Sequence, residues 1–96
     1  MREIYQQLTL RNNVENQRFE LEVENKTAFL EYKIEGNKYL LIHTEVPETL
    51  EGKGVAAALV EKVFIFIEES KFKFIPLCPY VLSYLKKHPE WLRLTN

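Results

Sequence analysis

The stretch PETLEGKGVAAALVEKV, residues 47–63, places two glycines directly before a long apolar segment. Pro47 ends the extended segment that precedes it, and most residues that follow Gly54 are apolar. Glycine adopts the positive φ of a tight turn at little cost, and a helix with so narrow a polar stripe is buried over most of its surface. We therefore expect a turn at residues 51–54, followed by a helix that ends near Glu69.

Three strands are expected before this turn. RFELEVEN, residues 18–25, alternates apolar and acidic side chains strictly, which is typical of a strand with one solvated face. TAFLEYKIEGNKYLLIHTEV, residues 27–46, is typical of a hairpin with the two-residue turn Gly36–Asn37. In its returning strand, one face is expected to hold Leu40, Ile42 and Thr44, and the other to hold Tyr39, Leu41, His43 and Glu45.

A strand and a helix are expected after the glycine turn. KFKFIPLC, residues 71–78, predicts the strand, and PYVLSYLKKH, residues 79–88, predicts the helix. A strand, a helix and a strand in succession favour a right-handed crossover between parallel strands. The expected fold class is α+β with a mixed sheet, in which antiparallel strands are followed by a β-α-β-α unit. One domain would span residues 18–96, whereas residues 1–17 are interpreted as an arm or a short helix.

Composition narrows the classes of function. With 96 residues, 46% of them hydrophobic, and a net charge of −1, the chain has the composition of one globular domain. It shows no basic stripe for nucleic acid and no apolar run near the ~20 residues of a membrane span. Cys78 is the only cysteine, and two distant histidines do not make a metal-binding pattern. We expect a cytoplasmic protein with no nucleic-acid or membrane partner and no bound metal.

The glycine turn itself has two interpretations. A helix start carries amide groups without intrahelical partners and a partial positive charge, so it can hold a phosphate group. Lys53 would add a positive charge beside such a site. In the other interpretation, Gly52 and Gly54 only form a tight turn into the helix.

Two segments in this order carry a family resemblance. HTEVPETLEGKGVAAALVEKV, followed after one strand by PLCPYVLSYLKKHPEW, resembles the GNAT superfamily of N-acetyltransferases. More narrowly, it is similar to the small acetyltransferase-like proteins that include the N-acetyltransferase domain-containing 1 proteins. The resemblance covers about residues 18–92. The superfamily's cofactor loop has the form [Arg/Gln]-x-x-Gly-x-[Gly/Ala], which this chain matches at Gly54 and Ala56 and departs from at Glu51.

This resemblance implies a minimal acyl-CoA N-acyltransferase fold that binds acetyl coenzyme A and acetylates an amine. The pantetheine arm would lie along the strand end from Thr44 to Val46, and the thioester would reach the splayed tips of the third and fourth strands. The acceptor, a small molecule or a protein, is not identified, and its site is open, shared across a homodimer or supplied by a partner. The coenzyme diphosphate would meet the amides of Glu51, Gly52, Lys53, Gly54, Val55 and Ala56.

Several side chains are candidates for the chemistry of acetyl transfer, which needs a base for the amine and an acid for the leaving thiolate. His43 and Glu45 are candidates for the base, or else a surface pair. Pro79 suits a first helical position, which makes Cys78 the N-cap. There the thiol would open onto the cofactor crevice and either accept the acetyl group or protonate the leaving group; in the other interpretation it only fills the core. Tyr84 is a candidate acid, as is Tyr80, and both could instead be packing residues.

Two rival functions remain at this point. One keeps the fold and the cofactor without efficient catalysis, which leaves a coenzyme-binding or regulatory module. The other is a protein-interaction domain whose glycine loop is only a turn.

Overall fold

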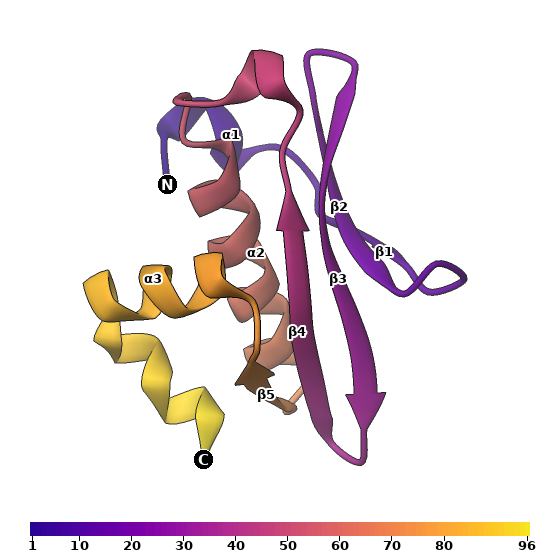
Figure 1. Ribbon diagram of the computed structural model, residues 1–96, viewed down its shortest axis with the longest axis vertical. Coiled ribbons are helices and arrows are strands. Elements are labelled where there is room, and N and C mark those ends of the chain that lie inside the picture. The colour runs from indigo at the N-terminus through magenta and orange to yellow at the C-terminus, as the bar shows by residue number, and fades with distance from the viewer.

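The computed structural model describes residues 1–96 and contains one five-stranded sheet with the strand order β1-β2-β3-β4-β5 (Figure 1). Neighbouring strands are antiparallel from β1 to β4, and β5 pairs with β4 in parallel. The strands are β1 (Arg11–Asn13), β2 (Arg18–Val23), β3 (Lys26–Glu35), β4 (Lys38–Glu45) and β5 (Lys73–Pro76). The predicted α+β class, with antiparallel strands followed by a β-α-β-α unit, is confirmed.

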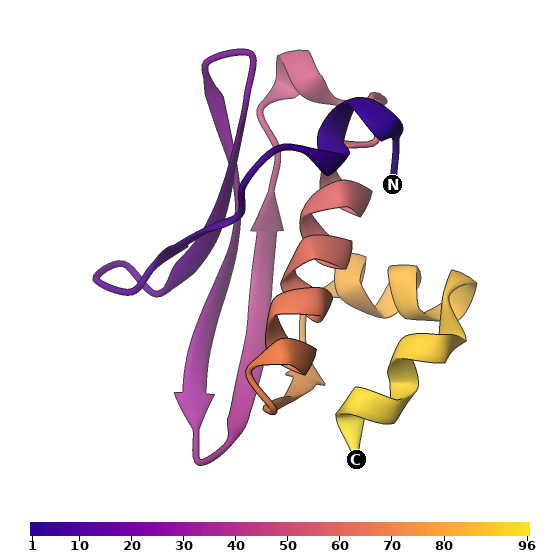
Figure 2. The ribbon, with the colours of Figure 1, turned by 180° about the vertical axis from the view of Figure 1, so that it is seen from behind.

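The helices gather on one side of strands β1–β4, and the other face of these strands is uncovered (Figures 1 and 2). Even the longest helix, with 15 residues, lacks the length and apolar character to span a membrane. The α-helices are α1 (Glu3–Gln6), α2 (Val55–Glu69) and α3 (Pro79–Lys87), and the 3₁₀ segments are η1 (Glu48–Leu50) and η2 (Pro89–Thr95).

The boundaries follow local backbone chemistry. The hairpin turn at Gly36–Asn37 is confirmed, since Glu35 pairs directly with Lys38. The strand predicted at 18–25 ends at Val23, because the next two residues take positive φ angles and form a turn. The strand predicted at 71–78 is shorter than expected and begins at Lys73, after Lys71 turns with a φ of 60°.

Residues 1–17 contain two elements that the sequence pattern did not resolve. The first is α1, whose Tyr5 is buried, and the second is the edge strand β1, in which Arg11 pairs with Glu20 of β2. The arm or short helix expected there is thus a helix followed by a short strand.

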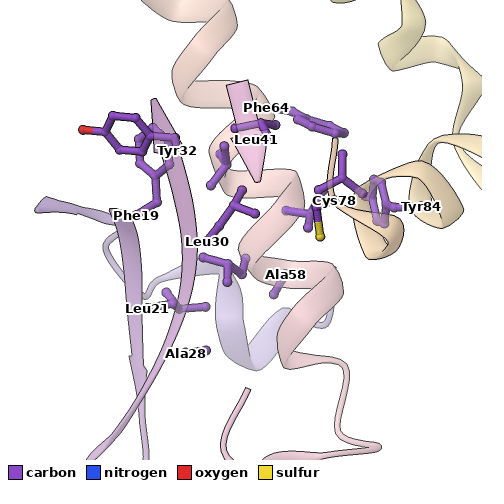
Figure 3. Close-up of a cluster of buried hydrophobic side chains, with 14 of the residues drawn as sticks. Phe19, Leu21, Ala28, Leu30, Tyr32, Leu41, Ala58, Phe64, Cys78 and Tyr84 are labelled. Carbon is purple, nitrogen blue, oxygen red and sulfur yellow. The ribbon is translucent and has the colours of Figure 1, made fainter. Parts of the chain in front are cut away.

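The core lies between the sheet and α2 (Figure 3). Phe64 of α2 stacks on Phe74 of β5, with ring centroids 4.5 Å apart, and contacts Tyr84 and Trp91 with its other edges. This aromatic cluster joins α2, the end of the sheet and the C-terminal helices into one unit. The side chains that are completely buried include Phe19, Leu21, Ala28, Leu30, Leu41, Ala58, Leu59, Val63, Phe64 and Ile67.

A β-bulge in β4 changes which side chains face the core. Tyr32 of β3 lies opposite Leu41, but the preceding Glu31 lies opposite His43, which leaves Ile42 as an extra residue. Beyond the bulge, Thr44 lies opposite the buried Leu30. The prediction that Leu41, His43 and Glu45 share one face is therefore wrong, because the bulge turns His43 and Glu45 to the uncovered face.

Candidate functional site

A cavity of about 450 Å³ lies where the end of β4 approaches the start of α2. In Figure 1 this is the upper part of the molecule, with α1 beside it. Three parts of the chain that are far apart in the sequence meet there: the N-terminal arm, the continuous stretch 46–57 from the end of β4 to the first turn of α2, and the first turn of α3. The lining residues are Arg2, Val46, Leu50, Glu51, Gly52, Gly54, Val55, Ala56, Ala57 and Tyr80.

The backbone amides at the start of α2 have no hydrogen-bond partner within the protein and lie beside this cavity. Gly52 and Gly54 have φ angles of 77° and 79°, and Gly54 is the N-cap of α2 without any side-chain cap. The first helical hydrogen bond runs from the Ala58 amide to the Gly54 carbonyl, at 3.1 Å. No backbone hydrogen bond begins at an amide of residues 52–57. These amides, together with the positive end of the helix, suit an anionic ligand.

The charges around the loop differ from those the sequence suggested. Glu51 lines the cavity, but Lys53 does not, because its ammonium group lies 3.6 Å from the Glu24 carboxylate on the surface. The backbone carbonyl of Lys53 accepts a hydrogen bond from the Tyr5 hydroxyl at 2.8 Å. The guanidinium group of Arg2 instead lines the cavity.

Strands β4 and β5 separate near this cavity. Their last paired residues are Leu41 and Pro76, and the Leu41 carbonyl accepts hydrogen bonds from the amides of both Leu77 and Cys78, each at 2.9 Å. Residues 42–45 of β4 have no partner on the β5 side. β4 and β5 are the third and fourth strands of the sequence prediction, so the splay expected between their tips is present.

Cys78 is the N-cap of α3, as the sequence indicated, but it does not open onto the cavity. It is only 2% exposed and belongs to the buried cluster, as Figure 3 shows. Its sulfur lies 3.3 Å from the Thr44 hydroxyl, which the bulge has turned inward. The expected opening onto the crevice is therefore wrong, because the thiol is packed in the core and contacts Thr44.

The two tyrosines of α3 lie in different surroundings. Tyr84 is 6% exposed, stacks on His88 and does not reach the cavity. Burial, and then the negative charge of Glu61, raise the pKa of Tyr84 well above its ordinary value, which makes it a weak acid. Tyr80 lines the cavity, and burial raises its pKa as well.

His43 and Glu45 do share a face, with the His43 Nε2 atom 3.4 Å from the Glu45 Oε1 atom. Both side chains are exposed and neither lines the cavity. Because the bulge turns them to the uncovered face of the sheet, they lie near the end of β4 without entering the cavity on the helical side.

The structure brings six of the eight proposed cofactor residues together and leaves two elsewhere. Val46, Glu51, Gly52, Gly54, Val55 and Ala56 line the cavity, whereas Thr44 and Lys53 do not. Sequence reasoning did not include Arg2, Leu50 or Ala57 among them. No local signal marks Arg2, because its position depends on a contact between the two ends of a long stretch of chain.

Comparisons with known proteins identify the family of the chain. A family model described as GCN5-related N-acetyl-transferase matches residues 18–94. Protein NATD1 of Xenopus tropicalis is 36% identical over 63 residues, which are 65% of this chain and 58% of that protein. Protein NATD1 of Homo sapiens is 35% identical over 63 residues, which are 65% and 56% of the two chains. The chain thus matches less than two thirds of the length of these relatives.

A solved structure shares the fold. The NMR solution structure of a GCN5-like protein from Staphylococcus aureus superposes with a TM-score of 0.70, at 23% identity. The superposition covers 93% of this chain and 88% of that one. This likeness supports the architecture, and the family model covers most of the sequence. The chain therefore belongs to the GCN5-related N-acetyltransferase family.

Proposed function

We propose that the protein binds acetyl coenzyme A in the cavity at the start of α2 and transfers the acetyl group to an amine. The observation that carries this proposal is the row of unpaired amides at residues 52–57, next to a cavity of about 450 Å³. An anion that accepts several backbone hydrogen bonds at a helix start is bound without any side chain. The coenzyme diphosphate is such an anion.

The splay between β4 and β5 suits the rest of the coenzyme. Residues 42–45 of β4 lack a partner on the β5 side, and Val46 continues into the cavity. An extended chain with amide groups can add to a free strand edge and form main-chain hydrogen bonds. The pantetheine arm has this chemistry, and it would direct the thioester toward the splay.

The acetyl group would then lie between two sets of candidate proton carriers. Tyr80 lines the cavity, unlike Tyr84, and its hydroxyl group is protonated at neutral pH like that of any tyrosine, so its position lets it donate a proton to the leaving thiolate. His43 and Glu45 lie on the uncovered face of the same strand, where an amine could approach from solvent. In this arrangement the amine attacks the thioester carbonyl, the carbon–sulfur bond breaks, and the amine proton passes to the base or to water.

Calorimetric titration with acetyl coenzyme A tests the binding site. Ala56→Glu is a sharp probe, because Ala56 lines the cavity and an acidic residue in the first helical turn is compatible with the helix. We expect Ala56→Glu to weaken binding at least tenfold, which is about 1.4 kcal/mol. Ser70→Glu, at the exposed residue that follows the other end of α2, adds the same charge away from the cavity and should bind normally. Normal binding by a folded Ala56→Glu variant would exclude this site.

A second candidate function is coenzyme binding without efficient transfer. The burial of Cys78 and Tyr84 favours it, because neither side chain reaches the cavity. Release of free thiol from acetyl coenzyme A in the presence of a panel of amines separates the two. Transfer that falls in Tyr80→Phe, with coenzyme binding retained, supports the enzyme, whereas binding with no release for any amine supports the module.

A further inference from the structure

Arg2 lies directly over the glycine loop. Its side chain lines the cavity, and its Nε atom is 3.2 Å from the position that a Cβ atom on Gly54 would take. This close approach depends on the absence of a side chain at Gly54. The guanidinium group therefore lies beside the unpaired amides at the start of α2.

The guanidinium group has no partner within the protein. None of the ion pairs of the structure involves Arg2, although Glu51 lines the same cavity. The other three arginines each contact a carboxylate, namely Glu20 for Arg11 and Arg18, and Glu68 for Arg93. Arg2 is thus an unpaired arginine, and it is the one that faces the cavity.

The segment that carries Arg2 is anchored on both sides of the loop. The Arg2 carbonyl accepts the amide of Tyr5, and the buried Tyr5 hydroxyl donates to the carbonyl of Lys53 in the loop. Farther along, the Lys62 ammonium of α2 donates to the carbonyl of Leu8 at 2.7 Å. These contacts hold the arm against both the loop and α2, so the backbone of Arg2 is kept beside the loop.

The charges of the side chains that line the cavity indicate a role for Arg2. Glu51 is the only other charged side chain that lines the cavity, since Lys53 pairs with Glu24 outside it. Without Arg2, the side chains of the cavity would carry a net negative charge and oppose a diphosphate. We propose that Arg2 is a phosphate-binding residue that donates hydrogen bonds to the coenzyme diphosphate above the loop. This inference rests on the proposed coenzyme site.

Arginine suits this task because its planar fork can donate two parallel hydrogen bonds to a phosphate group. The loop amides would approach the diphosphate from the helix side, and the guanidinium group would cover it from the arm. The N-terminal segment would then form part of the binding site, although it precedes the region that the family model matches, which begins at residue 18.

The test is a calorimetric titration of the full chain and of Arg2→Gln with two ligands, coenzyme A and dephospho-coenzyme A. The second ligand keeps the diphosphate and lacks the ribose 3′-phosphate. Arg11→Gln is the matched control, because it also removes one arginine charge but lies on β1, away from the cavity. Thermal melting of Arg2→Gln should match the unmodified chain, because its exposed side chain makes no hydrogen bond or ion pair.

We expect Arg2→Gln to weaken binding of both ligands by about tenfold or more, with a loss that shrinks as salt is added. Arg11→Gln should bind like the unmodified chain, and Tyr5→Phe, which releases the arm from the loop, should show a smaller loss of the same kind. Equal binding by Arg2→Gln and the unmodified chain would overturn this inference alone. A loss seen only with coenzyme A would overturn the assignment to the diphosphate. Absence of binding by the unmodified chain would overturn the proposed coenzyme site itself.

Discussion

The starts of α2 and α3 have similar local structures but differ in accessibility. In each, the chain leaves the sheet and begins a helix without a side-chain cap, at Gly54 in α2 and at Cys78 in α3. The start of α2 opens into a cavity, whereas the start of α3 is closed by Thr44 and the core. The difference shows that a helix start becomes a binding site only where packing leaves its amides accessible.

The largest effect on stability among these predictions is expected in the core beside the start of α3, which we call the closed end. Phe64→Ala removes a completely buried ring that stacks on Phe74 and contacts Tyr84. We expect the free energy of unfolding to fall by about 3–5 kcal/mol, as is usual for a buried phenylalanine. Urea denaturation followed by circular dichroism measures the loss. A change below about 1 kcal/mol would mean that the region around α3 is not part of a packed core.

Substitutions at the start of α2, which we call the open end, should change the free energy of unfolding less and ligand binding more. Gly54→Ala forces a side chain into a φ of 79° and against Arg2, whereas Gly52→Ala meets a similar φ with no neighbouring atom within 4 Å. We expect a loss of about 1–2 kcal/mol for each substitution from backbone strain. Both glycines line the cavity, but only Gly54→Ala should also displace Arg2, so it should weaken the binding of coenzyme A more than Gly52→Ala does.

Denaturation and titration of both variants provide the check. Equal affinities for coenzyme A in the two alanine variants would mean that the contact between Arg2 and Gly54 does not contribute to binding. A loss of affinity in Gly52→Ala alone would place the ligand at the other end of the turn.

The sequence predicted the elements well because their signals are local. Alternation in residues 18–25, the Gly36–Asn37 turn and the apolar helix after Gly54 each depend on neighbouring residues, and each has its counterpart in the structure. The parallel pairing of β4 and β5 was predicted from the order strand, helix, strand and is present in the structure. The cavity also lies at the predicted loop.

The site was less predictable because it depends on contacts between distant segments. The bulge at Ile42 is a property of pairing between β3 and β4, and it alone decides that Thr44 faces inward and His43 faces outward. Cys78 is buried in the core and contacts that inward Thr44. Arg2 reaches the loop only after α1 has packed beside it, so no pattern within residues 1–17 could have indicated its position.

The thiol itself provides a finer test of the closed end. Cys78→Ala should lower the free energy of unfolding by about 1 kcal/mol, because it removes one buried sulfur that contacts Thr44. In the unmodified chain, iodoacetamide should alkylate Cys78 more slowly than a free thiol, because the side chain is only 2% exposed. Mass spectrometry over a time course measures the rate. Rapid alkylation that acetyl coenzyme A prevents would show instead that the thiol opens onto the ligand.

The smallest effect is expected on the outer side of α2, which neither helix start uses. Ile65 is 36% exposed and lines a shallow cavity with Gln6, Leu10 and Lys62 beneath the N-terminal arm. Because one partly exposed apolar side chain contributes little to burial, Ile65→Lys should change the free energy of unfolding by less than about 0.5 kcal/mol. Coenzyme affinity should also stay unchanged, since the arm is fastened by Tyr5 and Lys62 rather than by this side chain.

Thermal melting, light scattering and calorimetry of Ile65→Lys check these expectations. Ile67→Lys is the contrasting variant, because the Ile67 side chain is completely buried and its substitution should unfold the protein. A large loss of stability, or a lower molar mass by light scattering, would mean that the outer side of α2 is covered by a second copy. A loss of coenzyme affinity with stability intact would mean that Ile65 helps to seat the arm. In that case ligand binding at the start of α2 depends on packing ten residues farther along the helix, because the arm holds Arg2 above the loop.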